Sequence, residues 1–145
     1  MKLVVCALLV LACGPKAPTG TSEPVNPTLR DTPFEALDQD QRAEFMKTVV
    51  LPTMKPLFTK HDSNRFRNFG CTTCHGKSAD AGEYLMPNAD LPKLTFADMS
   101  RFKKEDIEWM EKVIKPKMAS LLKQAERTSD NPNGFGCLSC HTEPK

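Results

Sequence analysis

Two copies of one short motif, Cys-x-x-Cys-His, constrain this chain of 145 residues more than any other feature. The first copy lies within FGCTTCHG at residues 69–76, and the second lies within FGCLSCHT at residues 135–142. The chain has six cysteines, so the motifs account for four of them and leave two, both near the start. The fold must therefore present the same set of side chains twice. The residues are Cys71, Cys74 and His75 in the first copy and Cys137, Cys140 and His141 in the second.

Cys-x-x-Cys-His is the attachment signature of c-type haem. Two thiols two residues apart add to the vinyl groups of the haem, and the adjacent histidine binds the iron as its proximal ligand. The two motifs therefore predict two haems c, with His75 and His141 as iron ligands. A zinc site and a redox dithiol are the alternatives. Haem is favoured because zinc needs no histidine after both pairs and a dithiol catalyst needs no second copy.

The first residues, MKLVVCALLVLACG, indicate export. Lys2 precedes an apolar run that is too short to span a bilayer but suits a secretory signal, and export is compatible with haem attachment outside the bacterial cytoplasm. Residues 10–13, Val-Leu-Ala-Cys, resemble the lipobox of bacterial lipoproteins. This resemblance implies removal of residues 1–12 as a signal peptide, with Cys6, and acylation of Cys13. An ordinary signal cleaved elsewhere and a membrane-associated apolar helix are the alternatives.

The stretch after Cys13 predicts a flexible tether. Residues 14–33 contain five prolines and almost no large apolar side chains, so they bury too little surface to offset the entropy lost on ordering. About 20 such residues reach about 25 Å, enough to hold a domain near a membrane surface. We therefore predict a lipidated, disordered tether at 13–33 and one domain at 34–145. Bound cofactors would help to complete the small core of this domain.

A longer repeat precedes each motif. EFMKTVVLPTMKPLF at 44–58 aligns with EWMEKVIKPKMASLL at 108–122, and both segments have apolar residues at helical spacing. The stretch between the halves, 76–100, has the Gly, Pro and Asn punctuation of a long loop, and no segment alternates like a strand. The predicted fold is therefore mainly α, a small internally duplicated domain in which a helix–loop–CxxCH unit occurs at about 38–76 and 102–142.

The sixth iron ligand is predicted from the same repeat. Among residues able to bind iron, only methionines recur at matched positions ahead of both motifs, which favours Met54 and Met118. Pro52 and Pro116 precede them by two residues, and each is expected to kink the helix or to start a new one. Core packing is the alternative role for such methionines. The other ligand candidates are Met46, Met110, Met86 and His61.

The order of helix-borne methionine, turn and Gly-Cys-x-x-Cys-His resembles the haem-binding segments of the photosynthetic reaction-centre cytochrome subunit. It is more closely similar to small di-haem lipoprotein cytochromes of Gram-negative bacteria, and the resemblance covers residues 44–76 and 108–142. It implies membership of the c-type cytochromes. Gly14 stands where an aspartate would retain a lipoprotein at the inner membrane, which implies anchoring at the outer membrane, facing the periplasm or the cell surface.

The function expected from these features is electron transfer rather than catalysis. Two six-coordinate haems would relay single electrons between extracytoplasmic redox proteins, with the lipid as the membrane contact. The net charge of +2, with both signs interspersed, gives no reason to expect a nucleic-acid partner. The alternative is a di-haem peroxidase or a small-ligand sensor with one open iron site. The small domain argues against this alternative because it leaves little chain for a substrate pocket.

Overall fold

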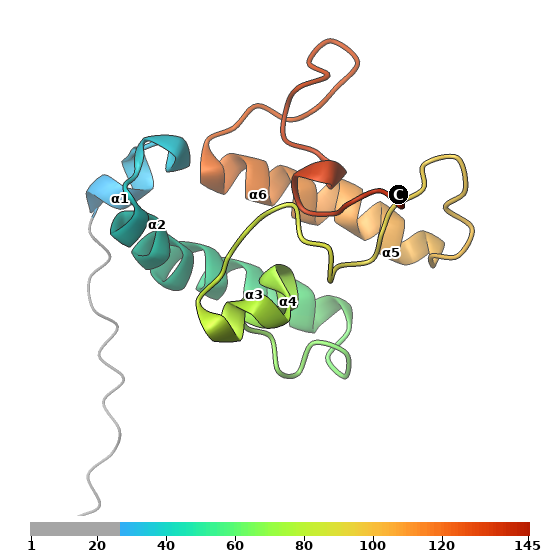
Figure 1. Ribbon diagram of the computed structural model, residues 1–145, viewed down its shortest axis with the longest axis horizontal. Helices are drawn as coiled ribbons and strands as arrows, with labels where there is room; N and C mark the ends of the chain where they lie inside the picture. The colour runs from blue at the N-terminus through green and yellow to red at the C-terminus, as the bar shows by residue number, and fades with distance from the viewer. Residues whose placement is uncertain (1–26) are drawn as a thin grey trace, which may run out of the picture.

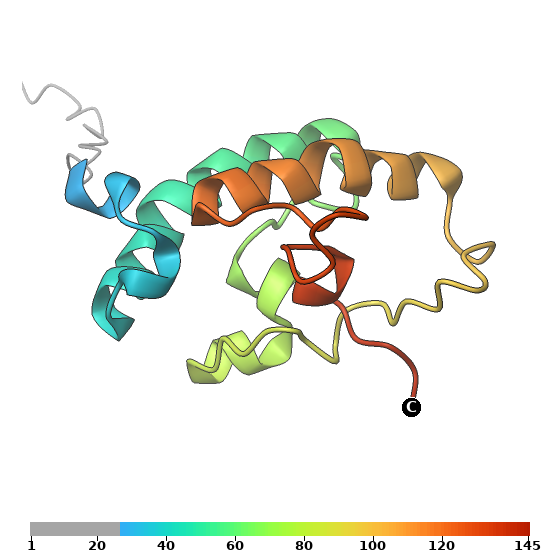
Figure 2. The ribbon, with the colours of Figure 1, turned by 90° about the horizontal axis from the view of Figure 1, so that it is seen from above.

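The structure, a computed structural model, describes residues 27–145, and within this range every regular element is a helix and no strand occurs. The mainly α prediction is thus confirmed. Two long helical runs lie side by side and in opposite directions, and the segments that carry the two motifs lie on the same side of this pair (Figures 1 and 2). The helix pair is therefore the scaffold on which the motifs are held.

Each long run is a continuous series of helical elements. The first run consists of α2 (Gln39–Phe45), the π-helical turn η2 (Met46–Val50) and α3 (Leu51–His61). The second consists of α5 (Lys104–Trp109), the π-helical turn η4 (Met110–Ile114) and α6 (Lys115–Leu122). The shorter elements are α1 (Pro27–Asp31), η1 (Phe34–Ala36), α4 (Cys71–His75), η3 (Lys77–Ala81) and η5 (Cys137–Ser139).

A π-helical turn stands directly ahead of the α-helix that contains Pro52 and of the one that contains Pro116. In each turn an N–H donates to the carbonyl five residues earlier, as Leu51 does to Met46. A proline lacks the backbone N–H donor, and its ring crowds the carbonyls of the preceding turn. The wider π-helical turn leaves room for that ring. The sequence predicted a kink or a new helix at each proline. Instead the backbone stays helical through both, so α3 and α6 continue the runs begun by α2 and α5.

The N-terminal helix α1 lies in the stretch that the sequence analysis assigned to the tether. Leu29 is only 5% exposed and belongs to the core, and the Lys123 ammonium donates to the Asp31 carbonyl at 2.6 Å. Residues 27–33 are therefore part of the folded domain, because Leu29 gives this proline-rich stretch an apolar side chain to bury. The predicted signal, Cys13 and the rest of the tether lie outside the described residues.

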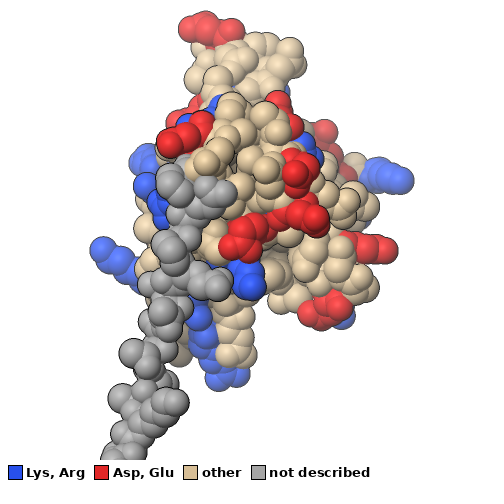
Figure 3. Space-filling view, turned by 90° about the vertical axis from the view of Figure 1, so that its left-hand side faces the viewer, with Lys and Arg blue, Asp and Glu red and all other residues tan. Residues whose placement is uncertain are grey.

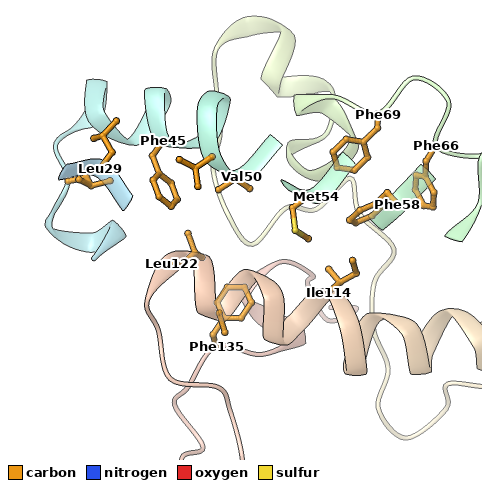
Figure 4. Close-up of a cluster of buried hydrophobic side chains, with 13 residues drawn as sticks. Leu29, Phe45, Val50, Met54, Phe58, Phe66, Phe69, Ile114, Leu122 and Phe135 are labelled. Atoms are coloured by element: carbon orange, nitrogen blue, oxygen red, sulfur yellow. The ribbon is translucent and has the colours of Figure 1, made fainter. Parts of the chain in front are cut away.

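An apolar cluster fills the space between the two runs (Figure 4). Phe45 and Val49 of the first run are almost completely buried, and Leu122 of the second run lies opposite Phe45. Burial of side chains of this size stabilises a fold by about 1.5–3 kcal/mol each. The first run begins at a capping box in which Asp38 accepts from the Gln41 N–H at 2.9 Å. The cluster therefore joins the two runs, and the capping box fixes where the first run begins.

The surface carries both signs of charge. Figure 3 shows Lys and Arg together with Asp and Glu on one face of the molecule. No helix in residues 27–145 is long and apolar enough to cross a membrane.

Candidate haem attachment sites

The two motifs fold through the same local hydrogen bonds. The Gly70 N–H donates to the Thr73 hydroxyl at 3.1 Å, and the Gly136 N–H donates to the Ser139 hydroxyl at 3.0 Å. In return the Thr73 and Ser139 N–H groups donate to the carbonyls of those glycines. Each hydroxyl thus closes a helical turn, on which cysteines three residues apart project from the same side. This turn presents two thiols together, as attachment to one haem requires.

None of the four motif cysteines forms a disulfide. Cys71 and Cys137 are exposed, whereas Cys74 and Cys140 are half-buried and pack against the core. Burial, with smaller contributions from the thiols of Cys140 and Cys71, raises the pKa of Cys74 to about 12. Burial and the thiol of Cys137 raise the pKa of Cys140 to about 11. Both of these second cysteines are therefore protonated at neutral pH.

The zinc alternative gains no support from the geometry. Zinc in a structural site is held by four ligands, mostly cysteine and histidine. In the part of the chain that the structure describes, no three His, Cys, Asp or Glu side chains are grouped closely enough to hold one ion. A haem iron takes only one histidine from each motif, so haem attachment does not need such a group.

His141 of the second motif is oriented by the backbone. Its Nδ1 lies 2.9 Å from the Pro92 carbonyl oxygen, which can only accept, so Nδ1 is the protonated nitrogen. The lone pair is then on Nε2. Histidines that bind metals commonly donate their other ring N–H to a carbonyl in this way, which fixes the ring and raises its basicity. The surroundings of His141 therefore fit an axial iron ligand.

His75 of the first motif has different surroundings. The ring is half-buried, and burial lowers the pKa of His75 against a smaller, opposing contribution from the Tyr84 backbone, which favours the neutral imidazole that binds metals. Tyr84 stands edge-on to it, with the ring centroids 5.4 Å apart. Within residues 27–145 its Nδ1 is buried without a hydrogen-bond partner, a condition that usually marks a missing ligand or water. His75 thus also suits an axial ligand, but no carbonyl orients it through Nδ1.

The predicted methionine ligands lie at the interface of the helix pair. Met54 is 2% exposed and extends from the first run into the space that Ile114 enters from the second (Figure 4). Met118 is half-buried and packs against the same cluster. Met46 and Met110, on the π-helical turns, do so as well. Met54 and Met118 stay the predicted ligands, and all four methionines also contribute to packing.

His61, the histidine outside the motifs, is engaged elsewhere. Its Nε2 lies 2.6 Å from Asp106 Oδ1, and its ring stacks on Trp109 with centroids 3.9 Å apart. Arg65 contacts the other oxygen of Asp106 at 3.3 Å. These contacts join the end of α3 to the start of the second run. The structure therefore gives His61 a role in packing and no support as a haem ligand.

A hollow of about 190 Å³ adjoins the second motif. It is smaller than the roughly 300–1,000 Å³ of ligand pockets, so it provides only part of the contact surface that a haem needs. Phe96 beside it is 53% exposed, and Tyr84 beside the first motif is 52% exposed. Exposed aromatic side chains at both motifs are surfaces that a bound haem can cover. The hollow is lined by Phe96, Lys115, Arg127, Gly136 and Cys137.

The loop between the halves contributes residues that the sequence analysis did not identify. Asn88 contacts both motifs through hydrogen bonds, and Pro92 orients His141. The sequence signal was limited to a cluster of Pro, Asn and Asp, which indicates only a loop. Thr73 and Ser139 were also missed, although a hydroxyl residue before the second cysteine is visible in both motifs.

A scan against protein-family models, a search of curated proteins and a search of solved structures find no match for this chain. The interpretation of the motifs therefore depends on the chemistry of their residues and on the geometry described above.

Proposed function

We propose that this chain is an exported c-type cytochrome that carries two covalent haems and transfers electrons. The observation that carries the proposal is the repeated Cys-x-x-Cys-His motif, folded through the same glycine-to-hydroxyl hydrogen bond at Thr73 and Ser139. The His141 bond to Pro92 supports it, because it leaves Nε2 available to iron.

We also propose that the domain arose by internal duplication. The π-helical turns η2 and η4 occupy matched positions in the aligned segments 44–58 and 108–122. Each is followed by a proline in the next α-helix and then by a motif. A shared local irregularity of this kind supports common descent of the halves more strongly than helical content alone, because π-helical turns are rare.

In this proposal each half holds one haem. Cys71 and Cys74 anchor the first, and the matching cysteines anchor the second through thioether bonds. His75 and His141 would hold the irons as histidine ligands, and Met54 and Met118 would hold them as methionine ligands. When bound, haem supplies a one-electron ferric/ferrous couple, whose potential methionine ligation raises. The chain would supply two protein ligands to each iron and leave no iron position open. The complete cofactor-binding set is Cys71, Cys74, His75, Met54, Cys137, Cys140, His141 and Met118.

The function is therefore that of an electron carrier between other redox proteins. The test uses the full chain, produced in a host that attaches c-type haem. Intact mass should show two haems per chain, and the reduced protein should not bind carbon monoxide. A chain with zinc or without haem would contradict the cytochrome proposal. Stoichiometric carbon monoxide binding would instead favour the peroxidase or sensor.

Anchoring by a lipid on Cys13 is the second part of the proposal. It is supported by the lipobox resemblance at residues 10–13. Cys13→Ser should move the protein from the membrane fraction to the soluble periplasmic or secreted fraction. Cys6→Ser is the matched control, because Cys6 is expected to leave with the signal peptide. If the two variants fractionate alike, the lipid anchor is refuted.

A further inference from the structure

Asn88 is the single buried polar residue in the described part of the chain, at 7% exposure. Its side-chain amide donates to the His75 carbonyl of the first motif, and its backbone N–H donates to the Cys140 carbonyl of the second at 2.9 Å. Its Oδ1 accepts from the Asp90 N–H at 2.7 Å. One residue outside the motifs thus contacts both of them, through its side-chain amide and its backbone N–H.

Asp90 strengthens the contact with the first motif. Its Oδ2 accepts from the Lys77 N–H at 3.0 Å, just after His75. Gly76 lies between them with a φ of +67°, and a Cβ there would be 2.6 Å from Asp90 Oδ2 and 3.0 Å from Asn88 Oδ1. The close approach therefore needs glycine for its conformation and for its missing side chain.

The same segment is bonded to the second motif at its other end. The Leu94 N–H donates to the Thr142 carbonyl at 2.9 Å, and Leu94 itself is 7% exposed. Between these two ends the Pro92 carbonyl accepts from His141. Residues 88–94, called the linker strap here, are therefore bonded to both motifs.

We propose that the linker strap holds the two haem attachment motifs in one fixed relative position, and that Asn88 is the positioning residue of this device. The consequence for the haems rests on the proposed function. Cys74 and Cys140 pack against one core, so a fixed relative position of the motifs would also fix the separation and orientation of haems attached to them, as electron exchange between the haems requires.

The proposal makes a distinctive prediction about coupling. Of the two motifs, the Asn88 side chain bonds only to the first, whereas the N–H groups of residues 88 and 94 bond only to the second. If the linker strap holds the two motifs together, removal of the Asn88 side-chain amide must also weaken the hydrogen bonds of the strap to the second motif. If Asn88 has only a local role, the effect must stay near Lys77 and Asp90, on the side of the first motif.

The test compares the full-length wild type with Asn88→Ala, Asn88→Asp and Asn131→Ala. Asn88→Asp keeps the Oδ1 acceptor and removes the donor to His75, so it decides the question if Asn88→Ala does not fold. Asn131→Ala is the matched control, because the Asn131 amide also donates to a carbonyl, that of Glu126, but within one loop. Amide hydrogen exchange is followed by NMR in the reduced protein, and haem content is followed by intact mass.

In the Asn88 variants the amides of residues 88 and 94 should exchange about tenfold faster, with the buried amides of α2 unchanged. Two haems should remain, and the two-signed Soret circular dichroism expected of a close haem pair in the wild type should shrink. The proposal would be overturned if faster amide exchange were confined to Lys77 and Asp90, or if Asn131→Ala increased the exchange rates of residues 88 and 94 equally. A di-haem wild type without this two-signed signal would also overturn it. A wild type without haem would refute the cytochrome proposal alone, because the exchange rates still decide the role of Asn88.

Discussion

The first and second motifs share their spacing and the glycine-to-hydroxyl hydrogen bond, but their histidines have different surroundings. His141 donates through Nδ1 to the Pro92 carbonyl, whereas His75 has a buried Nδ1 without a partner in residues 27–145 and a tyrosine at its edge. The first turn is α-helical over Cys71–His75, and the second is a 3-10 turn over Cys137–Ser139. A repeated sequence therefore repeats the cysteines and the histidine without repeating the surroundings of the histidine.

The cause of this difference is the single linker between the halves. It leaves the first motif at Gly76, turns back through Asn88 and passes the second motif at Pro92 and Leu94. One segment cannot present the same atoms to two motifs that it meets at different points. The same linker that ties the motifs together therefore makes them unequal.

The largest expected effect comes from removing either cysteine pair. Cys71→Ala with Cys74→Ala should leave one haem, and so should Cys137→Ala with Cys140→Ala, because each turn presents its own thiols. Each variant should also unfold at a lower temperature, since Cys74 and Cys140 pack against the core and the haem stabilises only the folded state. Intact mass and thermal unfolding check this. Loss of both haems from one double variant would show that the motifs do not act separately.

The methionines should give the next largest effect, and they sharpen the comparison because Met54 is buried and Met118 is half-buried. Met54→Ala should lower the free energy of unfolding by about 2–5 kcal/mol, and Met118→Ala by less. Each should also remove part of the methionine-to-ferric-iron absorption and let one iron bind carbon monoxide. Denaturant unfolding and absorption spectra measure both effects.

Met46→Ala and Met110→Ala are the controls, because both residues pack against the same cluster from the π-helical turns. These two variants should lower the free energy of unfolding and leave the absorption spectra unchanged. Spectra that change with Met46 and Met110, but not with Met54 and Met118, would reverse the ligand assignment.

The features that the sequence predicted well are local or periodic. Helical spacing at 44–58 and 108–122 indicated the two long runs, which the structure confirms as helices. The motif residues are identified by spacing alone, although their haems stay a prediction. In contrast, the π-helical turns were not predicted, because a hydrophobic period does not show how a helix adapts to Pro52 or Pro116.

The missed features depend on contacts between residues far apart in the chain. Leu29 lies in a proline-rich stretch whose composition indicates disorder, and only the core that it meets makes α1 part of the domain. Asn88 is an ordinary loop residue by sequence, and its role follows from two carbonyls that belong to different motifs. Composition and periodicity contain no information about such partners.

The difference between His75 and His141 should appear as a smaller effect on redox potential. In a haem-loaded protein, the bond from His141 to Pro92 would increase electron donation to iron and favour the ferric state. If this bond contributes about 1 kcal/mol, the second haem should have a potential lower by about 40 mV, since 59 mV is tenfold in a one-electron equilibrium. Spectroelectrochemical titration of the two single-haem cysteine variants assigns each potential. Equal potentials, or the opposite order, would show that the different surroundings of His75 and His141 do not set the two haem potentials in this way.

The long runs differ at their ends, which leads to the smallest predicted effect. The first run continues to His61, beyond the residue matched by Leu122, and this extension brings His61 to Asp106. The hydrogen bond from His61, with the nearby charges of Arg65 and other cations, lowers the pKa of Asp106. A carboxylate with a lowered pKa in the folded state stabilises the fold above its ordinary pKa of 3.8, and this contribution is lost as the pH falls through the lower folded value.

Asp106→Asn should therefore destabilise the protein at pH 7 and have little effect in strong acid. The Asp106 side chain is 30% exposed, so solvent screening keeps the expected loss below about 1 kcal/mol. Glu105→Gln, one residue earlier in α5 and exposed, is the control and should leave the pH profile unchanged. Denaturant unfolding from pH 7 to pH 3 measures the difference. A loss of equal size at every pH would mean that Asp106 acts through packing with Trp109 and His61 rather than through its charge, and the extension of the first run would then be a matter of shape alone.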